Sequence, residues 1–179
     1  ADDIASSVLG DFCDRAEEWE RKEDFFKFPV GIGTFENYPR FGNNAGPSPD
    51  GRFAQEAISS NYSPAVGRDK NGPTAVLRSS TKFDLQRVND GCPVDLKLSF
   101  SKSEEEGARI VEGLIKSFIK LNGNLMTITK VSTETLRQAQ EEPEKYASLR
   151  IRLGGLTAYF VQLAKPQQDE YIRRTQHGI

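Results

Sequence analysis

A long amphipathic helix pattern between two strand patterns is the feature that most constrains the fold of this chain. The helical segment reads SEEEGARIVEGLIKSFIKLNG. Ser103 and Glu106 have the spacing of a capping box, acidic residues fill the first turn, and Asn122 with Gly123 forms a stop signal. The broad apolar face of this helix must pack against a sheet or against further helices.

The two stretches that flank the helix have the patterns of strands. CPVDLKLSF alternates, with apolar residues on one face and Asp95, Lys97 and Ser99 on the other, which predicts a half-buried strand. NLMTITKV follows the helix as a second strand. Together with weaker patterns before and after, the order helix, strand, helix, strand, helix, strand, helix predicts an α/β fold.

The remaining elements are expected from shorter patterns. A stretch dense in Gly, Pro, Asn and aromatic residues, 25–64, is expected to be an ordered loop that covers other structure, because its aromatic side chains favour packing over disorder. The other expected elements are a helix over the first residues, a helix from about 74 to 83, a short helix from about 133 to 140, an extended segment over 149–153, and a final helix that begins near Pro166.

The composition limits the classes of partner. The 179 residues include 24 basic and 26 acidic side chains, and no basic stripe stands out, which argues against nucleic acid as the main partner. No window approaches the ~20 apolar residues that span a bilayer, and no signal pattern is present. We therefore expect a cytoplasmic protein that does not enter a membrane.

The first residues suggest a chain that belongs to something larger. ADDIASSVLGDFCDRAEEW has apolar residues at helical spacing and opens without Met. This favours a fragment, or one half of a split protein, that starts inside or just before a helix. A clipped or processed N-terminus is the alternative.

Few side chains are candidates for chemistry. GRDKNGPT has the glycine spacing of a phosphate loop, but Pro73 stands where the lysine should be, so a tight turn that starts a helix is expected. His177 lies near the end of the sequence, where chains are usually loose. Cys13 and Cys92 are expected to be buried hydrophobic residues, and with one histidine they are too few for a zinc site.

The unusual feature that remains is a pair of glycines in RIRLGGLTAYF, at Gly154 and Gly155. Glycine weakens a strand, so a pair of them in an apolar segment needs a reason. One reason is a tight turn. The other is chemical: after loss of one hydrogen atom, a glycine α-carbon can flatten and share its unpaired electron with the neighbouring amide and carbonyl, because no Cβ crowds it.

The segment SLRIRLGGLTAYFVQLAKPQQDEYIRRTQHGI resembles the C-terminal part of glycyl radical enzymes of the pyruvate formate-lyase superfamily. Their motif is an arginine, an aliphatic residue, a small residue and the radical glycine, which here correspond to Arg152, Leu153, Gly154 and Gly155. Leu156 departs from the aromatic residue usual at the next position. Three upstream stretches, GIGTFENYPRFGNNAGPSPDGRFAQE, SPAVGRDKNGPTAVLRSSTKFD and LNGNLMTITKVSTETLRQAQEEPEKY, also resemble the family in order and spacing.

The resemblance implies a fold and a division of the chain. It implies the C-terminal part of a ten-stranded α/β barrel, with the radical glycine on a loop inserted into the barrel. The parts expected from it are a helix over 1–24 that enters from a missing upstream part, and a C-terminal glycyl radical domain over 25–179. That domain would consist of the long aromatic loop 25–64, an α/β core 65–148, a radical loop 149–160 and a terminal helix 165–176.

The resemblance also implies the chemistry. A radical S-adenosylmethionine activase with a [4Fe-4S] cluster would install the radical on Gly155, with no cofactor or metal bound by this chain itself. The radical would then pass to a cysteine on a missing N-terminal part or subunit, since Cys92, 63 positions before Gly155, does not match the family's cysteine motif. The substrate would be a small molecule, and GRDKNGPTA resembles the dehydratase and decarboxylase branches of these oxygen-sensitive lyases of anaerobic metabolism.

Three functions stay open from the sequence. The first is the radical-storing part of a lyase, inactive without its cysteine-bearing part. The second is an autonomous spare-part protein that restores an enzyme of the pyruvate formate-lyase type after oxygen has cleaved it. The third is a structural α/β domain in which the two glycines only make a turn.

Overall fold

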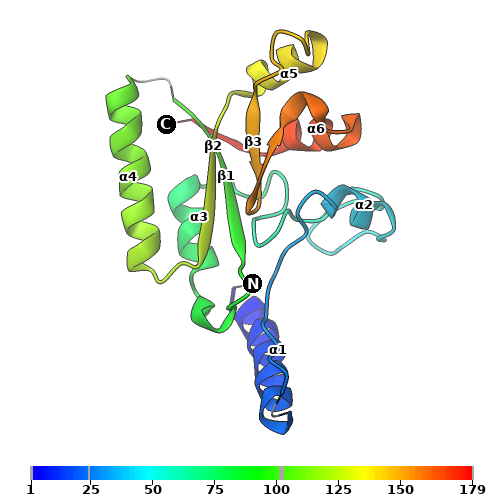
Figure 1. Ribbon diagram of the computed structural model, residues 1–179, viewed down its shortest axis with the longest axis vertical. Helices are drawn as coiled ribbons and strands as arrows, with labels where there is room; N and C mark the ends of the chain where they lie inside the picture. The colour runs from blue at the N-terminus through cyan, green and yellow to red at the C-terminus, as the bar shows by residue number, and fades with distance from the viewer. Residues whose placement is uncertain (1, 24, 101–102, 179) are drawn as a thin grey trace.

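The structure, a computed structural model, describes residues 2–23, 25–100 and 103–178. These residues form one parallel sheet with α-helices around it and a separate antiparallel hairpin beside it (Figure 1). The chain is therefore α/β, as its pattern predicts.

The parallel sheet has its longest strand in the middle. β1 (Pro93–Ser99) pairs with β2 (Leu125–Lys130) on one side and with β5 (Gln176–Gly178) on the other. Parallel neighbours need a crossover, and α4 (Glu104–Lys120) provides it between β1 and β2. The predicted cap at Ser103 is confirmed, since the Ser103 hydroxyl accepts a hydrogen bond from the Glu106 backbone amide at 3.3 Å.

The main hydrophobic core lies between this sheet and two helices. α3 (Pro73–Ser80) and α4 supply buried side chains that pack on alternate residues of β1. The core consists of Val76, Leu77, Val94, Leu96, Leu98, Leu114 and Phe118. The turn expected in GRDKNGPT is confirmed, because a turn at Lys70 and Asn71 leads into α3, which begins at Pro73.

The second face of β1 differs from its prediction. Asp95 and Lys97 were expected on a polar face of a half-buried strand, but the Lys97 residue is only 3% exposed and the Asp95 side chain 5%. The reason is β5, which pairs beside Lys97, and α6 (Lys165–Arg173), whose last turn lies over it. A central strand of a parallel sheet is covered on both faces, so alternation does not mark a solvent face here.

The elements around the hairpin form a second core. α5 (Thr133–Glu141) and α6 pack with β3 (Arg150–Leu153), β4 (Leu156–Tyr159) and the short helix η2 (Phe160–Gln162). Its buried members are Val131, Leu136, Ala139, Ile151, Leu153, Phe160 and Tyr171.

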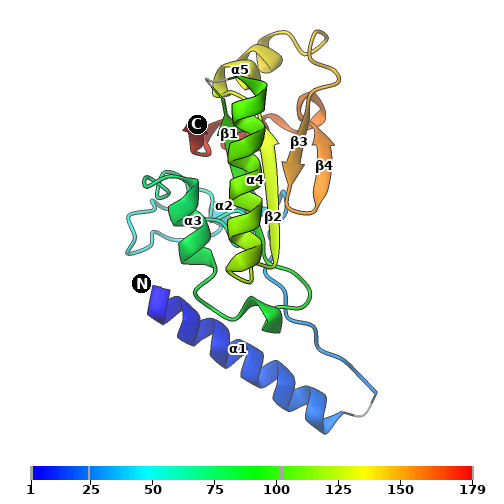
Figure 2. The same ribbon diagram turned by 90° about the vertical axis from the view of Figure 1, so that its left-hand side faces the viewer.

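α1 (Asp2–Lys22) extends away from the sheet, as Figure 2 shows. It buries only Leu9 and Cys13, against the region of η1 (Leu85–Arg87). Ion pairs from Arg87 to Asp14 at 2.6 Å and to Glu17 at 2.7 Å hold the same contact.

Some expected bounds need correction. The helix expected over 1–24 runs from Asp2 to Lys22, and residues 1 and 24 lie outside the described residues. The expected loop 25–64 contains the short helix α2 (Tyr38–Asn43), with Pro39 in its first turn. The helix expected over 165–176 ends at Arg173, because Arg174 turns to extended backbone and Gln176–Gly178 pair with β1 instead.

Candidate functional site at the two-glycine hairpin

The two glycines form the turn of a β-hairpin. β3 and β4 pair from Arg150 with Tyr159 up to Leu153 with Leu156, so Gly154 and Gly155 are the two central residues of the connection (Figure 2). Gly154 has a φ of +60°, whereas the φ of Gly155 lies outside the left-handed range. A left-handed first residue alone is the pattern of a type II′ hairpin turn.

The two glycines differ in what surrounds them. A Cβ on Gly154 would lie 3.0 Å from the Asn61 Nδ2 and 3.4 Å from a ring carbon of Phe35, in addition to the strained φ. A Cβ on Gly155 would meet no heavy atom within 4 Å. Backbone geometry therefore requires glycine at 154 and does not require it at 155 within the described chain.

Asn61 forms the platform on which Gly154 lies. Its side-chain oxygen accepts hydrogen bonds from the backbone amides of Thr34 and Phe35, both at 2.9 Å. The backbone amide of Asn61 donates to the Thr34 hydroxyl at 2.8 Å. Asn61 and Phe35 both have left-handed φ values, 51° and 47°. Left-handed residues other than glycine concentrate where the fold holds a specific loop geometry, so the loop under the hairpin is closely specified.

A buried polar network supports this platform. The Asn61 Nδ2 donates to Asp95 Oδ2 at 2.7 Å, and the Thr127 hydroxyl donates to Asp95 Oδ1 at 2.6 Å. Arg174 lies 3.7 Å from the same carboxylate and donates to the Ser60 hydroxyl at 2.7 Å. The hairpin tip is thereby connected to the central strand and to the end of α6.

The sides of the hairpin are anchored separately from its tip. The Arg152 amide donates to the Thr129 hydroxyl of β2 at 3.1 Å, and Ile151 and Leu153 are buried in the second core. The side chain of Arg152 lies across the turn, where its Nη2 donates to the Gly155 carbonyl at 3.3 Å and its Nη1 to the Thr157 hydroxyl at 2.5 Å.

The tip of the hairpin is open in the described chain. Gly155 and Thr157 are exposed, and Leu156 is 57% exposed. An apolar side chain at the end of a hairpin gains from being covered, and no described residue covers this one.

The two cysteines lie away from this site. Cys13 and Cys92 are both buried and belong to a third cluster, with Leu9, Val30, Leu85 and Val88. Burial raises the pKa of Cys92 to about 11 and also raises that of Cys13. Both thiols therefore have the character expected of them, that of inert core residues.

His177 is not loose, contrary to expectation. It lies in β5, is buried, and its Nε2 is 3.1 Å from the carboxylate of Asp69, which also accepts from the Thr175 hydroxyl. Although burial raises the pKa of Asp69, these two hydrogen bonds lower it overall. No sequence pattern marks this pair, because Asp69 and His177 are distant in the chain and the β1–β5 pairing places His177.

Lys97, which was expected on a polar face of its strand, instead makes buried contacts with α6. Its ammonium donates to the carbonyls of Tyr171 at 3.4 Å and Ile172 at 3.0 Å, at the last turn of α6. Burial lowers its pKa to about 8, with repulsion from Arg174 and Arg137 adding to the effect and Asp69 opposing it. A cation at free helix carbonyls stabilises a helix end, so Lys97 fixes α6 on the sheet.

Within residues 2–23, 25–100 and 103–178, no cluster of His, Cys, Asp and Glu side chains could hold a metal ion. None of the helices in these ranges combines the length and the apolar character needed to cross a bilayer.

Comparison with known protein families gives a match over most of the chain. The family model described as "Glycine radical" matches residues 58–161, which include the hairpin and its two glycines.

Curated relatives match as well. The isethionate sulfite-lyase of Nitratidesulfovibrio vulgaris is 32% identical over 99% of the chain and 22% of its own length. The 4-hydroxyphenylacetate decarboxylase glycyl radical subunit of Clostridioides difficile is 32% identical over 94% of the chain and 18% of its own length. The chain therefore spans about a fifth of the length of the curated relatives it matches.

Solved structures share the fold. A glycyl radical enzyme from Archaeoglobus fulgidus superimposes on the whole chain with a TM-score of 0.90 and 34% identity, over 23% of its own length. The B12-independent glycerol dehydratase from Clostridium butyricum superimposes on 99% of the chain, with a TM-score of 0.88 and 28% identity.

Proposed function

Because the chain belongs to the glycine radical family, we propose that it stores an unpaired electron on the α-carbon of Gly155. One Cα–H bond of Gly155 breaks homolytically, and a radical S-adenosylmethionine activating enzyme takes the hydrogen atom. The radical that remains is planar and is shared with the amide nitrogen on one side and the carbonyl on the other.

The observation that carries this proposal is the contrast between the two glycines of the turn. Gly154 is explained by its left-handed φ and by Asn61, whereas neither backbone nor packing explains Gly155. Gly46, Gly113 and Gly178 share that freedom, so the freedom of Gly155 is informative only together with the motif of Arg152, Leu153 and Gly154 before it. Both the freedom around Gly155 and the motif before it are explained if the chemistry of this residue requires that it has no side chain.

The radical needs a thiol that the described residues do not offer. The radical at Gly155 takes the hydrogen atom of a cysteine S–H group, which restores glycine and leaves a thiyl radical to act on the substrate. Cys13 and Cys92 are buried in another cluster, so neither can reach the turn without unpacking its core. The proposal therefore assigns the reactive cysteine to a part of the enzyme that this chain does not span.

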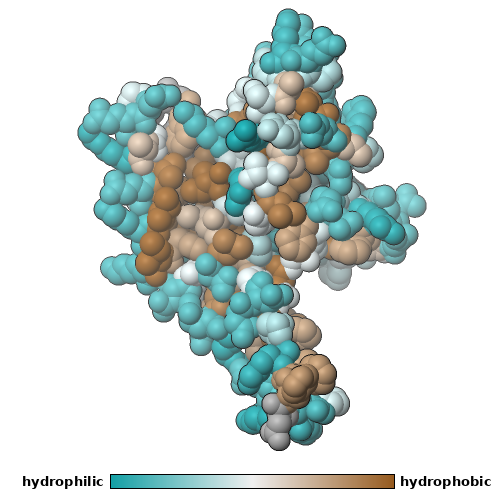
Figure 3. Space-filling view, in the orientation of Figure 1, coloured by the Kyte–Doolittle hydropathy of each residue, from teal (hydrophilic) through white to brown (hydrophobic). Residues whose placement is uncertain are grey.

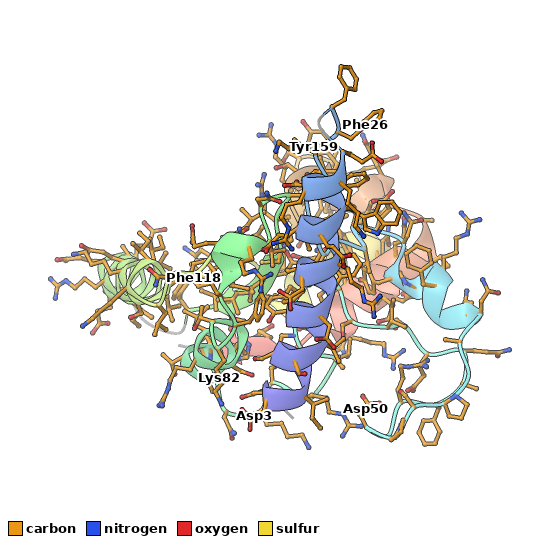
Figure 4. The ribbon with its side chains drawn as sticks, turned by 90° about the horizontal axis from the view of Figure 1, so that it is seen from below. Asp3, Phe26, Asp50, Lys82, Phe118 and Tyr159 are labelled. Atoms are coloured by element: carbon orange, nitrogen blue, oxygen red, sulfur yellow. The ribbon has the colours of Figure 1, made fainter. Side chains whose placement is uncertain are left out.

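The surface of α1 supports a larger assembly. Ile4, Val8 and Phe12 recur at intervals of four residues on one side of the helix and are each more than half exposed, and Trp19 is exposed as well. A groove between this side and the following loop is lined by Phe26, Phe28 and Pro29, among others. Figure 4 shows Phe26 at the far end of α1.

A second uncovered apolar surface lies over α4 and β2. Figure 3 shows apolar side chains gathered there, and the groove between the two elements is lined by Phe100, Val111, Ile115 and Ile128, together with charged residues at its rim. Contiguous exposed apolar surface marks a contact site, and the relatives are about five times longer than this chain. We propose that the cysteine-bearing part covers these surfaces and the hairpin tip, and completes the ten-stranded barrel.

The reaction proposed is that of a carbon-centred lyase of the dehydratase and decarboxylase type acting on a small molecule. The relatives and structures named above support this class, since they include a sulfite-lyase, a decarboxylase and a glycerol dehydratase.

The test is electron paramagnetic resonance of the complete enzyme after anaerobic incubation with its activating enzyme. The expected spectrum is a doublet from one α-hydrogen, absent in Gly155→Ala and retained in Gly113→Ala, which changes a glycine with equal space around it on α4. A doublet that persists in Gly155→Ala would assign the radical to another residue.

A further inference from the structure

Arg152 holds the carbonyl group of the glycine at which the radical is proposed. Its Nη2 donates to the Gly155 carbonyl oxygen at 3.3 Å, and its Nη1 donates to the Thr157 hydroxyl at 2.5 Å. The second bond fixes the guanidinium over the turn, because the planar group is held at two of its donors. Arg152 therefore presents a positive charge to one specific backbone oxygen.

We propose that Arg152 stabilises the Gly155 radical through this hydrogen bond, an inference that rests on the proposed function. The carbonyl oxygen of Gly155 is one of the atoms over which the unpaired electron is shared. In one resonance form of the radical, electron density moves from the amide nitrogen through Cα to the carbonyl group, and the carbonyl oxygen then carries negative charge. A cationic donor already aimed at an oxygen where charge develops favours this form, and charge-assisted hydrogen bonds are the stronger kind.

The proposal predicts an effect on the radical itself. Without the Arg152 donor, less spin is shared with the carbonyl and more stays on the α-carbon, so the splitting by the remaining α-hydrogen increases. The radical is then less stable relative to the reduced glycine. A substitution of the Arg152 side chain can change the radical without changing the fold, because the backbone amide of residue 152 keeps its hydrogen bond to the Thr129 hydroxyl.

Arg150 provides a matched control on the same strand. It lies two residues before Arg152, so both side chains project from the same face of β3. Its guanidinium lies 5.4 Å from the centre of the Tyr159 ring and makes no hydrogen bond to Gly155. Arg150→Gln removes the same charge from the hairpin without touching the radical residue.

The experiment compares Arg152→Gln, Arg152→Lys, Thr157→Val and Arg150→Gln in the complete enzyme, activated under anaerobic conditions. We expect Arg152→Gln to widen the doublet and to lower the radical content per chain about three- to tenfold. Thr157→Val should change the splitting and the radical content in the same direction but by less. Arg152→Lys, which keeps the charge, should lie between Arg152→Gln and the unchanged chain in both quantities. Arg150→Gln should match the unchanged chain, and circular dichroism melts confirm that each variant is folded.

Three results would overturn the inference. A doublet of unchanged splitting and content in Arg152→Gln would show that the hydrogen bond does not act on the radical. Equal changes in Arg150→Gln and Arg152→Gln would show a general effect of charge. A doublet that is absent in the unchanged enzyme, or that survives Gly155→Ala, would remove the proposed function and the inference with it, whereas the first two results would leave the proposed function standing.

Discussion

At the scale of single residues, the hairpin turn assigns different roles to two neighbouring glycines. Gly154 is a conformational glycine, since its φ is +60° and a Cβ would lie only 3.0 Å from the Asn61 side chain. Gly155 has neither constraint. The motif in the sequence singled out Gly155, but the reason for Gly154 depends on Asn61, which is 93 residues away and could not be recognised as its neighbour from the sequence.

The two glycines should respond differently to alanine. Gly154→Ala is expected to lower the free energy of unfolding by about 1–2 kcal/mol, because an L-residue in the left-handed region is strained. Gly155→Ala is expected to leave it unchanged or to raise it by up to about 1 kcal/mol, because alanine restricts the unfolded chain. Urea denaturation of both variants checks this, and a larger loss for Gly155→Ala than for Gly154→Ala would contradict it.

At the scale of elements, the sequence predicted those helices and strands whose patterns depend only on residues close together in the chain. The helix α4, its cap at Ser103 and the strands on either side of it are where the sequence put them. β5 was missed because three residues, Gln176–Gly178, have no periodicity and become a strand only by pairing with β1. The same pairing buries Lys97 and His177, so both were assigned to the wrong environment.

Asn61 is expected to control how firmly the hairpin is attached. Asn61 is buried, and Asn61→Ala would leave the partly buried amides of Thr34 and Phe35 without their acceptor, which should cost about 1–3 kcal/mol of unfolding free energy and speed hydrogen exchange in β3 and β4. The matched control is Asn44→Ala, an exposed asparagine beside α2, where a change within about 0.5 kcal/mol is expected. Equal effects of the two substitutions would contradict this role.

Lys97 should make stability depend on pH. Its pKa is about 8 in the folded chain and 10.5 ordinarily, so between these values the unfolded chain binds the extra proton and stability rises with pH. Above pH 9 the rise is opposed, because the raised pKa of Cys92 makes folding disfavour its thiolate. The unfolding free energy should therefore increase by about 1 kcal/mol from pH 8 to 9, and Lys97→Met should abolish the increase. A variant with the same pH profile as the unchanged chain would argue against a buried cation.

At the scale of the whole molecule, the described chain leaves apolar surfaces uncovered, which supports the proposed larger assembly. The hairpin tip, the side of α1 and the groove over α4 are apolar and uncovered within the described residues. The aromatic side chains of the loop after α1 were expected to pack on other structure, but within the described chain Tyr38 is buried whereas Phe25 and Phe53 are 87% and 73% exposed. The sequence could not show which apolar residues the chain itself buries. That depends on the final packing, in which α1 buries Leu9 and Cys13 and leaves Val8 65% exposed.

Val8→Glu is expected to weaken the contact with the cysteine-bearing part that we propose. A buried valine contributes about 1.5–3 kcal/mol and a buried carboxylate opposes binding further, so the dissociation constant should rise at least about tenfold. Ser7→Glu adds the same charge at the neighbouring exposed position and should change it little. Calorimetric titration of the two parts measures both, and equal weakening by the two substitutions would contradict a contact on the apolar side of α1.

The most direct test of the account is mass spectrometry of the activated enzyme after exposure to air. Oxygen that adds to a backbone radical breaks the chain at the residue that carries it. The account predicts a break at Gly155, in the turn between β3 and β4, with none in chains that were never activated. An intact chain after verified activation, or a break at another residue, would contradict it.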